Sequence, residues 1–312
     1  MVIELTESFE VLDPRFRKLA FPNVHVEELW TGCRWAEGPA WFAAGRYLVW
    51  SDIPNDRMLR WDETDGSVSV FRQPAMNTNG HTVDLQGRLV SCEHRGRCVS
   101  RTEHDGSRTV LVSHADGRRF NSPNDVVVKS DGSLWFTDPS YGIDSDYEGD
   151  AAPSEIGASR VYRFDEASGA LTVVADDFVQ PNGLAFSPDE RLLYVVESRA
   201  TPHRRIWQYD VGAGGQLSNK RLFVDAQGPG AYDGIAVDRR GNVWCGFGCS
   251  SGAQSAELDG VRVYGASGRA IGHVHLPERC ANLCFGGPKH NRLFMAASRS
   301  LYALYVNVQG AA

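Results

Sequence analysis

A polar residue followed by a short apolar run recurs six times along this chain, and each run leads into a Gly-containing turn and an aromatic-rich strand. The six polar positions are Glu37, Asn79, Asn124, Asn182, Asp233 and Asn282. Their start-to-start spacings are 42, 45, 58, 51 and 49 residues. A period in the forties built from short strands is typical of a β-propeller. The sequence therefore predicts an all-β fold, a six-bladed β-propeller with four-stranded antiparallel blades around a central channel.

The third repeat shows how one blade is expected to form. Residues 125–128 are a near-continuous apolar run typical of a buried inner strand. Residues 134–137, 160–165 and 171–174 follow as three more strands. The sixth repeat lacks a fourth strand of its own, and we expect the N-terminal segment 24–29 to supply it. That pairing would close the ring and remove an exposed sheet edge.

The repeats run almost end to end without a Pro- or Ser-rich linker. We therefore expect a single propeller domain over residues 1–312. The longest spacing contains an insertion, residues 141–159, whose first ten residues are too long for a tight hairpin and too polar for a strand. A loop of this length is either a lid or binding loop or a solvated decoration, and the sequence leaves both readings open.

Composition excludes several classes of partner. The net charge of −7 and the absence of a long Lys/Arg cluster argue against general binding to nucleic acid or anionic membranes. Residues 1–7 do not resemble a signal peptide, and no apolar run reaches transmembrane length. The seven cysteines are expected to be mostly small buried residues in a reducing compartment, which predicts a cytoplasmic location.

Equivalent positions of a propeller converge on its axis, so the six repeat positions would direct six oxygen-bearing side chains into one small space. Two of them are carboxylates and the others are Asn amides. Such oxygens are ligands for hard divalent cations. The alternative is structural, because Asn-Gly and Asp-Gly are also common turn pairs.

Several of these positions lie in motifs that resemble the gluconolactonase/regucalcin (senescence-marker-like) family. The motifs fall in order between about residues 35 and 285, and they are Trp35-Ala36-Glu37-Gly38-Pro39, Asn121-Ser122-Pro123-Asn124-Asp125, Phe136-Thr137-Asp138-Pro139, Gln180-Pro181-Asn182-Gly183-Leu184 and Tyr232-Asp233-Gly234-Ile235. The resemblance implies a six-bladed propeller with one divalent cation at the mouth of its channel. It also implies hydrolysis of a sugar lactone such as glucono-1,5-lactone.

Carried over by motif, the metal ligands would be Glu37, Asn124, Asn182 and Asp233. The resemblance also gives Asp233 the role of catalytic base or nucleophile. Ca²⁺ is the expected ion, and Mg²⁺, Mn²⁺ or Zn²⁺ would also accept oxygen ligands. In the implied mechanism the metal acts as a Lewis acid on the lactone while Asp233 removes a proton from the attacking water.

The chain departs from the family pattern at one motif. The regucalcin branch has an Arg-Phe-Asn-Asp run in which the Asn lies at the metal site. Here Arg119-Phe120-Asn121 is separated by Ser122-Pro123 from Asn124-Asp125. Repeat spacing aligns Asn124 with the other ring positions, so we assign Asn124 to the metal. We expect Asn121 to contact either the substrate or the residues behind the metal ligands. The role of Arg119 stays open.

Further substrate contacts are expected from Asn79, Asn121, His81, His94 and Tyr141. His81 lies two residues after Asn79, on the same face of a strand. It would either line the pocket or be a hydrogen-bonded core histidine. His94 stands at a strand end, and Tyr141 opens the insertion.

Other readings remain open from the sequence. The enzyme would be a gluconolactonase-type hydrolase, acting as a monomer or small homo-oligomer. The alternatives are a phosphotriesterase-like or broader lactonase of the same propeller family, or a calcium-binding propeller scaffold without turnover. WD40 and kelch scaffolds lack support, because their recurring signatures are absent from this sequence.

Overall fold

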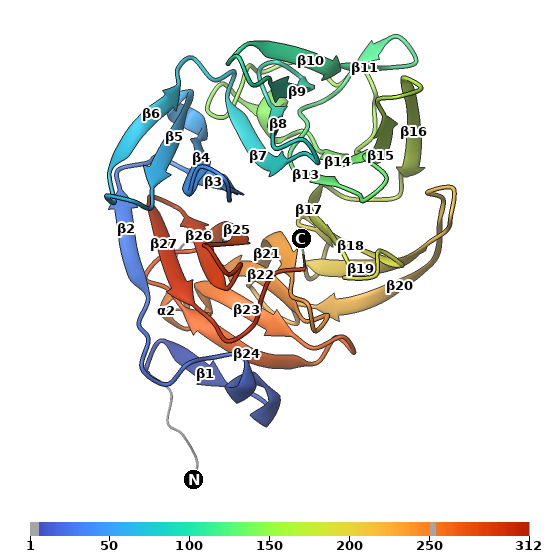
Figure 1. The fold of residues 1–312 in the computed structure, drawn as a ribbon. Helices are drawn as coiled ribbons and strands as arrows, with labels where there is room; N and C mark the ends of the chain where they lie inside the picture. The colour runs from blue at the N-terminus through green and yellow to red at the C-terminus, as the bar shows by residue number, and fades with distance from the viewer. Residues whose placement is uncertain (1–5, 250–253, 312) are drawn as a thin grey trace.

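In the computed structural model, which describes residues 6–249 and 254–311, six twisted sheets stand side by side around a central axis (Figure 1). Each blade has its innermost strand at one edge of the sheet and its outermost strand at the other. The chain passes from blade to blade in sequence order, as the colour gradient of Figure 1 shows. The predicted six-bladed β-propeller with antiparallel four-stranded blades is confirmed.

The first three blades follow the predicted repeats. Blade one contains β3 (Ala36–Phe42), β4 (Tyr47–Asp52), β5 (Arg57–Asp62) and β6 (Val68–Arg72), with the short helix η2 (Ile53–Asn55) between β4 and β5. Blade two contains β7 (Thr78–Val83), β8 (Leu89–Glu93), β9 (Cys98–Thr102) and β10 (Arg108–Val112). The ribbon β11 (His114–Ala115) and β12 (Arg118–Arg119) then leads to blade three, which contains β13 (Val126–Val128), β14 (Leu134–Asp138), β15 (Arg160–Asp165) and β16 (Ala170–Ala175).

The remaining blades use both ends of the chain. Blade four contains β17 (Pro181–Phe186), β18 (Leu192–Glu197), β19 (Arg205–Val211) and β20 (Leu217–Asp225). Blade five contains β21 (Ala231–Val237), β22 (Val243–Gly248), β23 (Gly260–Tyr264) and β24 (Ala270–His275), with β1 (Phe9–Val11) as a fifth strand and helix α2 (Ser255–Leu258) before β23. Blade six contains β25 (Cys280–Gly286), β26 (Arg292–Ala297), β27 (Ser300–Tyr305) and β2 (Glu27–Thr31).

Strand β2 joins the two ends of the propeller. It pairs antiparallel with β27, so that Glu28 lies opposite Tyr302. The segment expected to close the ring, residues 24–29, overlaps β2 but begins three residues too early. The short helix η1 (Pro14–Lys18) precedes β2 and places Phe16 in the core beside Trp244. Because β27 has a partner, its edge is covered.

Hydrophobic side chains fill the spaces between neighbouring blades. The described residues form six buried clusters, one at each blade interface. Trp50, Trp135 and Trp244 are completely buried in these clusters. Their strands therefore need aromatic and β-branched residues, which pack well between two pleated surfaces.

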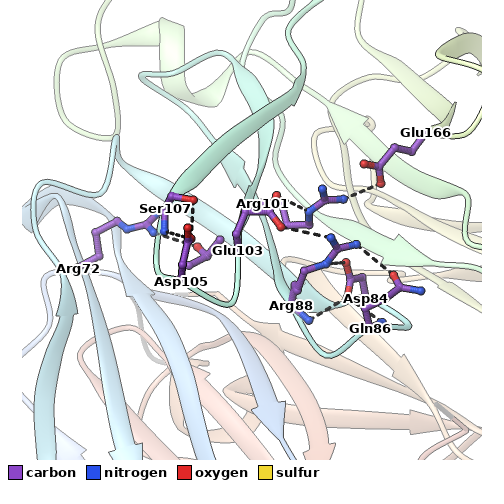
Figure 2. A network of polar contacts seen from close by, with 10 residues as sticks. Arg72, Asp84, Gln86, Arg88, Arg101, Glu103, Asp105, Ser107 and Glu166 are labelled. Atoms are coloured by element: carbon purple, nitrogen blue, oxygen red, sulfur yellow. Dashed lines mark hydrogen bonds and ion pairs between the residues drawn. The ribbon is translucent and has the colours of Figure 1, made fainter.

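Polar contacts fasten blade two to blade three near the outer strands (Figure 2). Arg101 donates to Glu103 at 2.8 Å in its own blade and to Glu166 at 2.6 Å in the next blade. Arg88 connects to the same group through Glu103 and also pairs with Asp84 at 2.8 Å. The Arg101 side chain is 9% exposed, so this network is less screened by water than most surface ion pairs.

Helices are short in this protein. In the described ranges, no helix is long and apolar enough to cross a membrane. Helix α1 (Tyr141–Asp144) lies at the start of the predicted insertion. It places the first residue of that insertion beside the channel.

Candidate active site

Five of the six innermost strands are irregular where the sequence places a polar repeat position, whereas Asn124 lies just before the regularly paired β13. In the described structure the ladder of β3 shifts register between Glu37 and Ala40, and that of β21 shifts between Tyr232 and Ile235. Strands β7, β17 and β25 have the same irregularity at the equivalent place. A β-bulge changes the direction of a side chain and interrupts pairing. The Asn-Gly and Asp-Gly pairs therefore lie in bulged inner strands rather than in hairpin turns.

The glycines of these pairs let neighbouring inner strands approach closely. A Cβ added to Gly183 would lie 2.5 Å from the backbone oxygen of Asp233. A Cβ on Gly38, which has φ +54°, would collide with the backbone oxygen of Asn79. At the next interface, Gly80 donates its N–H to the Asn124 oxygen at 2.8 Å. Each close approach brings one ring residue next to the following one.

A pocket of about 440 Å³ opens at one end of the channel. Five of the six ring positions are among its lining residues, namely Glu37, Asn79, Asn124, Asn182 and Asp233. The described lining also includes Trp35, Tyr141, Tyr147, Glu148, Ser198, Arg199, Arg204, Ala231 and Arg279. The sixth ring position, Asn282, instead lines a second pocket of about 210 Å³. The expectation that all six side chains share one space therefore needs this correction.

The carboxylate of Asp233 in the larger pocket is held by an ion pair. Its Oδ2 accepts a hydrogen bond from Arg279 Nη2 at 2.7 Å. Its Oδ1 is buried and has no hydrogen-bond partner among the described residues. Burial raises the pKa of Asp233 to about 6, although the Arg279 guanidinium opposes that shift. One oxygen is thus held in place while the other lacks a partner.

Glu37 is the second carboxylate of the pocket and is 4% exposed. Its Oε2 accepts the Gly38 N–H at 3.0 Å. Burial raises the Glu37 pKa well above its usual range, and the nearby carboxylates of Asp233 and Asp125 raise it further. Two buried carboxylates that repel each other need protons or a cation to balance their charge.

The donor set fits a divalent cation of the kind that the resemblance implies. Glu37, Asn124, Asn182 and Asp233 all line the same pocket, and the unpartnered Asp233 Oδ1 is an available ligand atom. No group of three His, Cys, Asp or Glu side chains within the described ranges forms a metal-binding cluster. The candidate set instead combines two carboxylates with Asn oxygens, which are neutral hard ligands. The four-residue metal site remains a prediction.

His94 holds the second ring residue in a defined orientation. Its Nδ1 lies 3.1 Å from the Glu148 carbonyl oxygen, and its Nε2 lies 3.3 Å from Asn79 Nδ2. These partners require a proton on Nδ1, so that Nε2 accepts from the Asn79 amide. The side-chain oxygen of Asn79 is then free to face the pocket. Burial lowers the His94 pKa to about 4, so the ring is neutral near pH 7.

His81 lies on the other side of the ring. It is in the lining of the smaller pocket and is 6% exposed. Its Nε2 lies 2.7 Å from the Ser51 hydroxyl, and its Nδ1 lies 2.8 Å from the Ser91 hydroxyl. Burial lowers its pKa to about 3. Both ring nitrogens therefore have partners inside the blades.

The insertion forms a wall of the larger pocket. Tyr141 lines the pocket, and its hydroxyl forms a hydrogen bond with the Ser198 hydroxyl. Tyr147 and Glu148 come from the same insertion. Arg95 ties the segment to blade two through a 3.1 Å ion pair with Asp150. The insertion therefore lies against the pocket rather than extending away as a solvated decoration.

Asn121 helps to hold this insertion and is absent from the described lining of the pocket. Its Nδ2 donates to the carbonyl oxygens of Asp138 and Ala158, at 3.2 and 2.8 Å, and its Oδ1 accepts from Ser154. Arg119 also contacts structural partners. Its backbone N–H donates to Glu155 at 3.0 Å.

Several pocket residues were not expected from the sequence. Arg279 lies one residue before β25, and Arg199 and Arg204 lie in the loop between β18 and β19. Glu148 is half-buried, and its pKa is raised to about 7, chiefly by burial. These residues do not recur at the repeat period, so the repeat could not reveal them. The one sequence feature that could have indicated them is their place in loops at the same end of the blades as the ring residues.

The family model and two curated relatives of this chain point to lactonases. Residues 35–299 match the model of the family described as SMP-30/Gluconolactonase/LRE-like region. The chain is 30% identical to a gluconolactonase of Zymomonas mobilis, over 92% of this chain and 83% of that protein. It is 29% identical to the pentonolactonase XacC of Haloferax volcanii, over 86% and 83% of the two chains.

Solved structures agree with these sequence matches. A gluconolactonase from Xanthomonas campestris superposes with a TM-score of 0.86 and 36% identity, over 96% of this chain and 94% of that one. A calcium-binding protein, regucalcin, from Agrobacterium tumefaciens has a TM-score of 0.74 at 20% identity, over 92% of this chain and 95% of that one, which supports the fold alone. With the family model spanning most of its length, this chain belongs to the SMP-30/gluconolactonase/LRE-like family.

Proposed function

We propose that this protein hydrolyses a sugar lactone, glucono-1,5-lactone or a related aldonolactone, to the aldonic acid. Relatives named gluconolactonase and pentonolactonase support a lactone hydrolase. We further propose that activity requires one divalent cation, with Ca²⁺ as the expected ion, held by Glu37, Asn124, Asn182 and Asp233. The hard oxygen donors that line the pocket support this requirement.

The observation that carries the proposal is the state of Asp233. Arg279 fixes one carboxylate oxygen at 2.7 Å, while the other is buried without a hydrogen-bond partner in the described structure. An unpartnered buried oxygen is costly unless a ligand or substrate uses it.

The pocket residues support a simple hydrolysis. A bound divalent cation would supply Lewis-acid chemistry toward the lactone. Asp233 accepts a proton from water as the water oxygen bonds to the lactone carbonyl carbon. The bond between that carbon and the ring oxygen then breaks, and the ring oxygen takes up the proton. Arg279 keeps the Asp233 carboxylate in position throughout.

Other side chains would orient the sugar. The Asn79 oxygen faces the pocket because its amide nitrogen is held by His94. Tyr141 and Ser198 place a pair of hydroxyls at the wall, where they can exchange hydrogen bonds with sugar hydroxyls. Asn121 and His81 are not among the proposed substrate contacts, because the Asn121 side chain is bonded to the insertion and the His81 side chain to serines within the blades.

Replacing Asp233 with Asn tests the proposal. The variant keeps the size of the side chain but cannot accept the proton, so lactone hydrolysis should fall by about 10²- to 10⁴-fold. Asp189→Asn is a suitable control, because the Asp189 side chain is 61% exposed in a turn of blade four. Thermal unfolding would establish that both variants fold. An Asp233→Asn protein that keeps the wild-type rate would contradict the proposal.

A further inference from the structure

One arginine of the pocket lacks the partner that its neighbours have. Arg204 lines the larger pocket. Its Nε is buried without a hydrogen-bond partner, and no ion pair of its side chain is found within residues 6–249 and 254–311. By contrast, Arg279 pairs with Asp233 and Arg199 pairs with Asp144 at 3.1 Å. The Arg204 guanidinium is therefore available to a ligand.

Arg204 lies in the outer part of the pocket. The ring residues come from innermost strands, such as Asn182 on β17, whereas Arg204 immediately precedes β19, the third strand from the axis. A lactone whose carbonyl reaches Asp233 near the axis would extend its other end outward. A group on the exocyclic carbon projects beyond the sugar ring and can therefore reach Arg204.

The charge of the pocket favours an anion at that end. Its described lining contains three acidic side chains, Glu37, Asp233 and Glu148, and three arginines. Because Asp144 neutralises Arg199, a divalent cation at the predicted ligands would leave an excess of one positive charge. Glu148 opposes an anion only in part, because burial raises its pKa to about 7.

Building on the proposed lactonase function, we infer that the preferred substrate is a sugar lactone with an anionic group on its exocyclic carbon, and that Arg204 binds this group. Carboxylate, phosphate and sulfonate share the required chemistry. A guanidinium can donate two parallel hydrogen bonds to any of them. A volume of about 440 Å³ is in the range of pockets that enclose small ligands.

The test compares neutral and anionic lactones on the intact protein. Initial rates would be measured with glucono-1,5-lactone, 6-phosphoglucono-1,5-lactone and glucaro-1,4-lactone, the last two carrying phosphate and carboxylate. The variants are Arg204→Gln and Arg204→Lys. Arg191→Gln is the matched control, because the Arg191 side chain is 84% exposed on the same blade and its nearest ion pair is 3.8 Å long.

We expect the wild-type protein to have a higher kcat/KM for at least one anionic lactone than for the neutral one. Arg204→Gln should raise KM for that anionic lactone by about tenfold or more, with kcat little changed, and should raise KM for glucono-1,5-lactone much less. Arg204→Lys should recover part of the loss, since it keeps the charge but not the paired donors. Arg191→Gln should match the wild type.

The outcomes separate the two proposals. Wild-type turnover of the neutral lactone without any preference for an anionic one would overturn this inference and leave the proposed function intact. An equal effect of Arg204→Gln on neutral and anionic lactones would also overturn it. Folded wild-type protein that hydrolyses none of the lactones would overturn the proposed function itself.

Discussion

At the scale of single residues, the side chains nearest the axis are those that the sequence could indicate. Glu37, Asn124, Asn182 and Asp233 recur at the repeat period, and the structure brings them into one pocket. Arg204 and Glu148 do not recur, because they lie in connecting segments that differ from blade to blade. Periodicity identifies equivalent backbone positions, but it contains no information on loops that occur once.

His94 allows a test of how a ring residue is held. Replacing His94 with Phe removes the acceptor for Asn79 and the donor to Glu148, so kcat/KM for a lactone should fall by about tenfold as both lose their positions. His94→Gln keeps an acceptor and should retain more activity. His104→Gln, at an exposed turn, is the matched control.

The pH profile separates positioning from proton transfer. Because burial lowers the His94 pKa to about 4, the histidine does not titrate between pH 6 and 8.5. The loss in His94→Phe should therefore be the same across that range. A loss that appears on only one side of neutral pH would contradict a positioning role.

At the scale of strands, the inner bulges explain why glycine follows a polar residue. The sequence alone left a turn or a ring position as alternatives for each Asn-Gly and Asp-Gly pair. The structure shows bulged strands in which the glycine gives space to the neighbouring backbone. This could not be predicted, because the contact is made with a different blade that is about 50 residues away in sequence.

Gly183→Ala tests this explanation. The new Cβ would lie 2.5 Å from the Asp233 backbone oxygen, and a backbone atom cannot move aside as a flexible side chain can. We expect the free energy of unfolding to fall by about 1–3 kcal/mol. Gly228→Ala is the control, because its nearest neighbouring atom is 3.9 Å away, and it should change stability by less than about 0.5 kcal/mol. Equal stabilities of the two variants, measured by denaturant unfolding, would contradict the packing argument.

At the scale of the whole molecule, the propeller concentrates acidic groups in its centre. Burial raises the pKa values of Asp125 and Asp138 to about 7, and that of Glu37 is raised well above normal. The folded protein therefore keeps protons that the unfolded chain has released above pH 5. The stability that these retained protons contribute is fully present below the carboxyl pKa values of the unfolded chain, about 4. It is lost as the pH rises through the carboxyl pKa values of the folded protein.

A clear pH window follows for the metal-free protein. Below about pH 6.5 the buried neutral histidines have the opposite effect, since His81 and His273 have pKa values lowered to about 3. Between pH 6.5 and 8 only the carboxyl effect operates among these groups. In chelator, the free energy of unfolding should fall over that range by about 1.4 kcal/mol per pH unit for each retained proton. The melting temperature should fall with it.

Ca²⁺ should make the fall of melting temperature with pH shallower, because an ion held by ionised Glu37 and Asp233 replaces the protons. Glu37→Gln should also make the slope of stability against pH in chelator shallower, since it removes a buried carboxyl whose pKa is raised well above its usual range. Thermal unfolding at half-unit steps of pH would measure both effects. A melting temperature in chelator that rises from pH 6.5 to 8 would contradict the account.

We propose that the ring pocket is a metal-dependent lactonase site. The most direct test is the initial rate of glucono-1,5-lactone hydrolysis, followed by proton release, before chelation, after chelation, and after Ca²⁺, Mg²⁺, Mn²⁺ or Zn²⁺ is added back. We predict turnover well above the spontaneous rate, its loss in chelator, and its recovery with at least one ion. A rate that chelation leaves unchanged, or folded protein inactive with every ion, would contradict the claim.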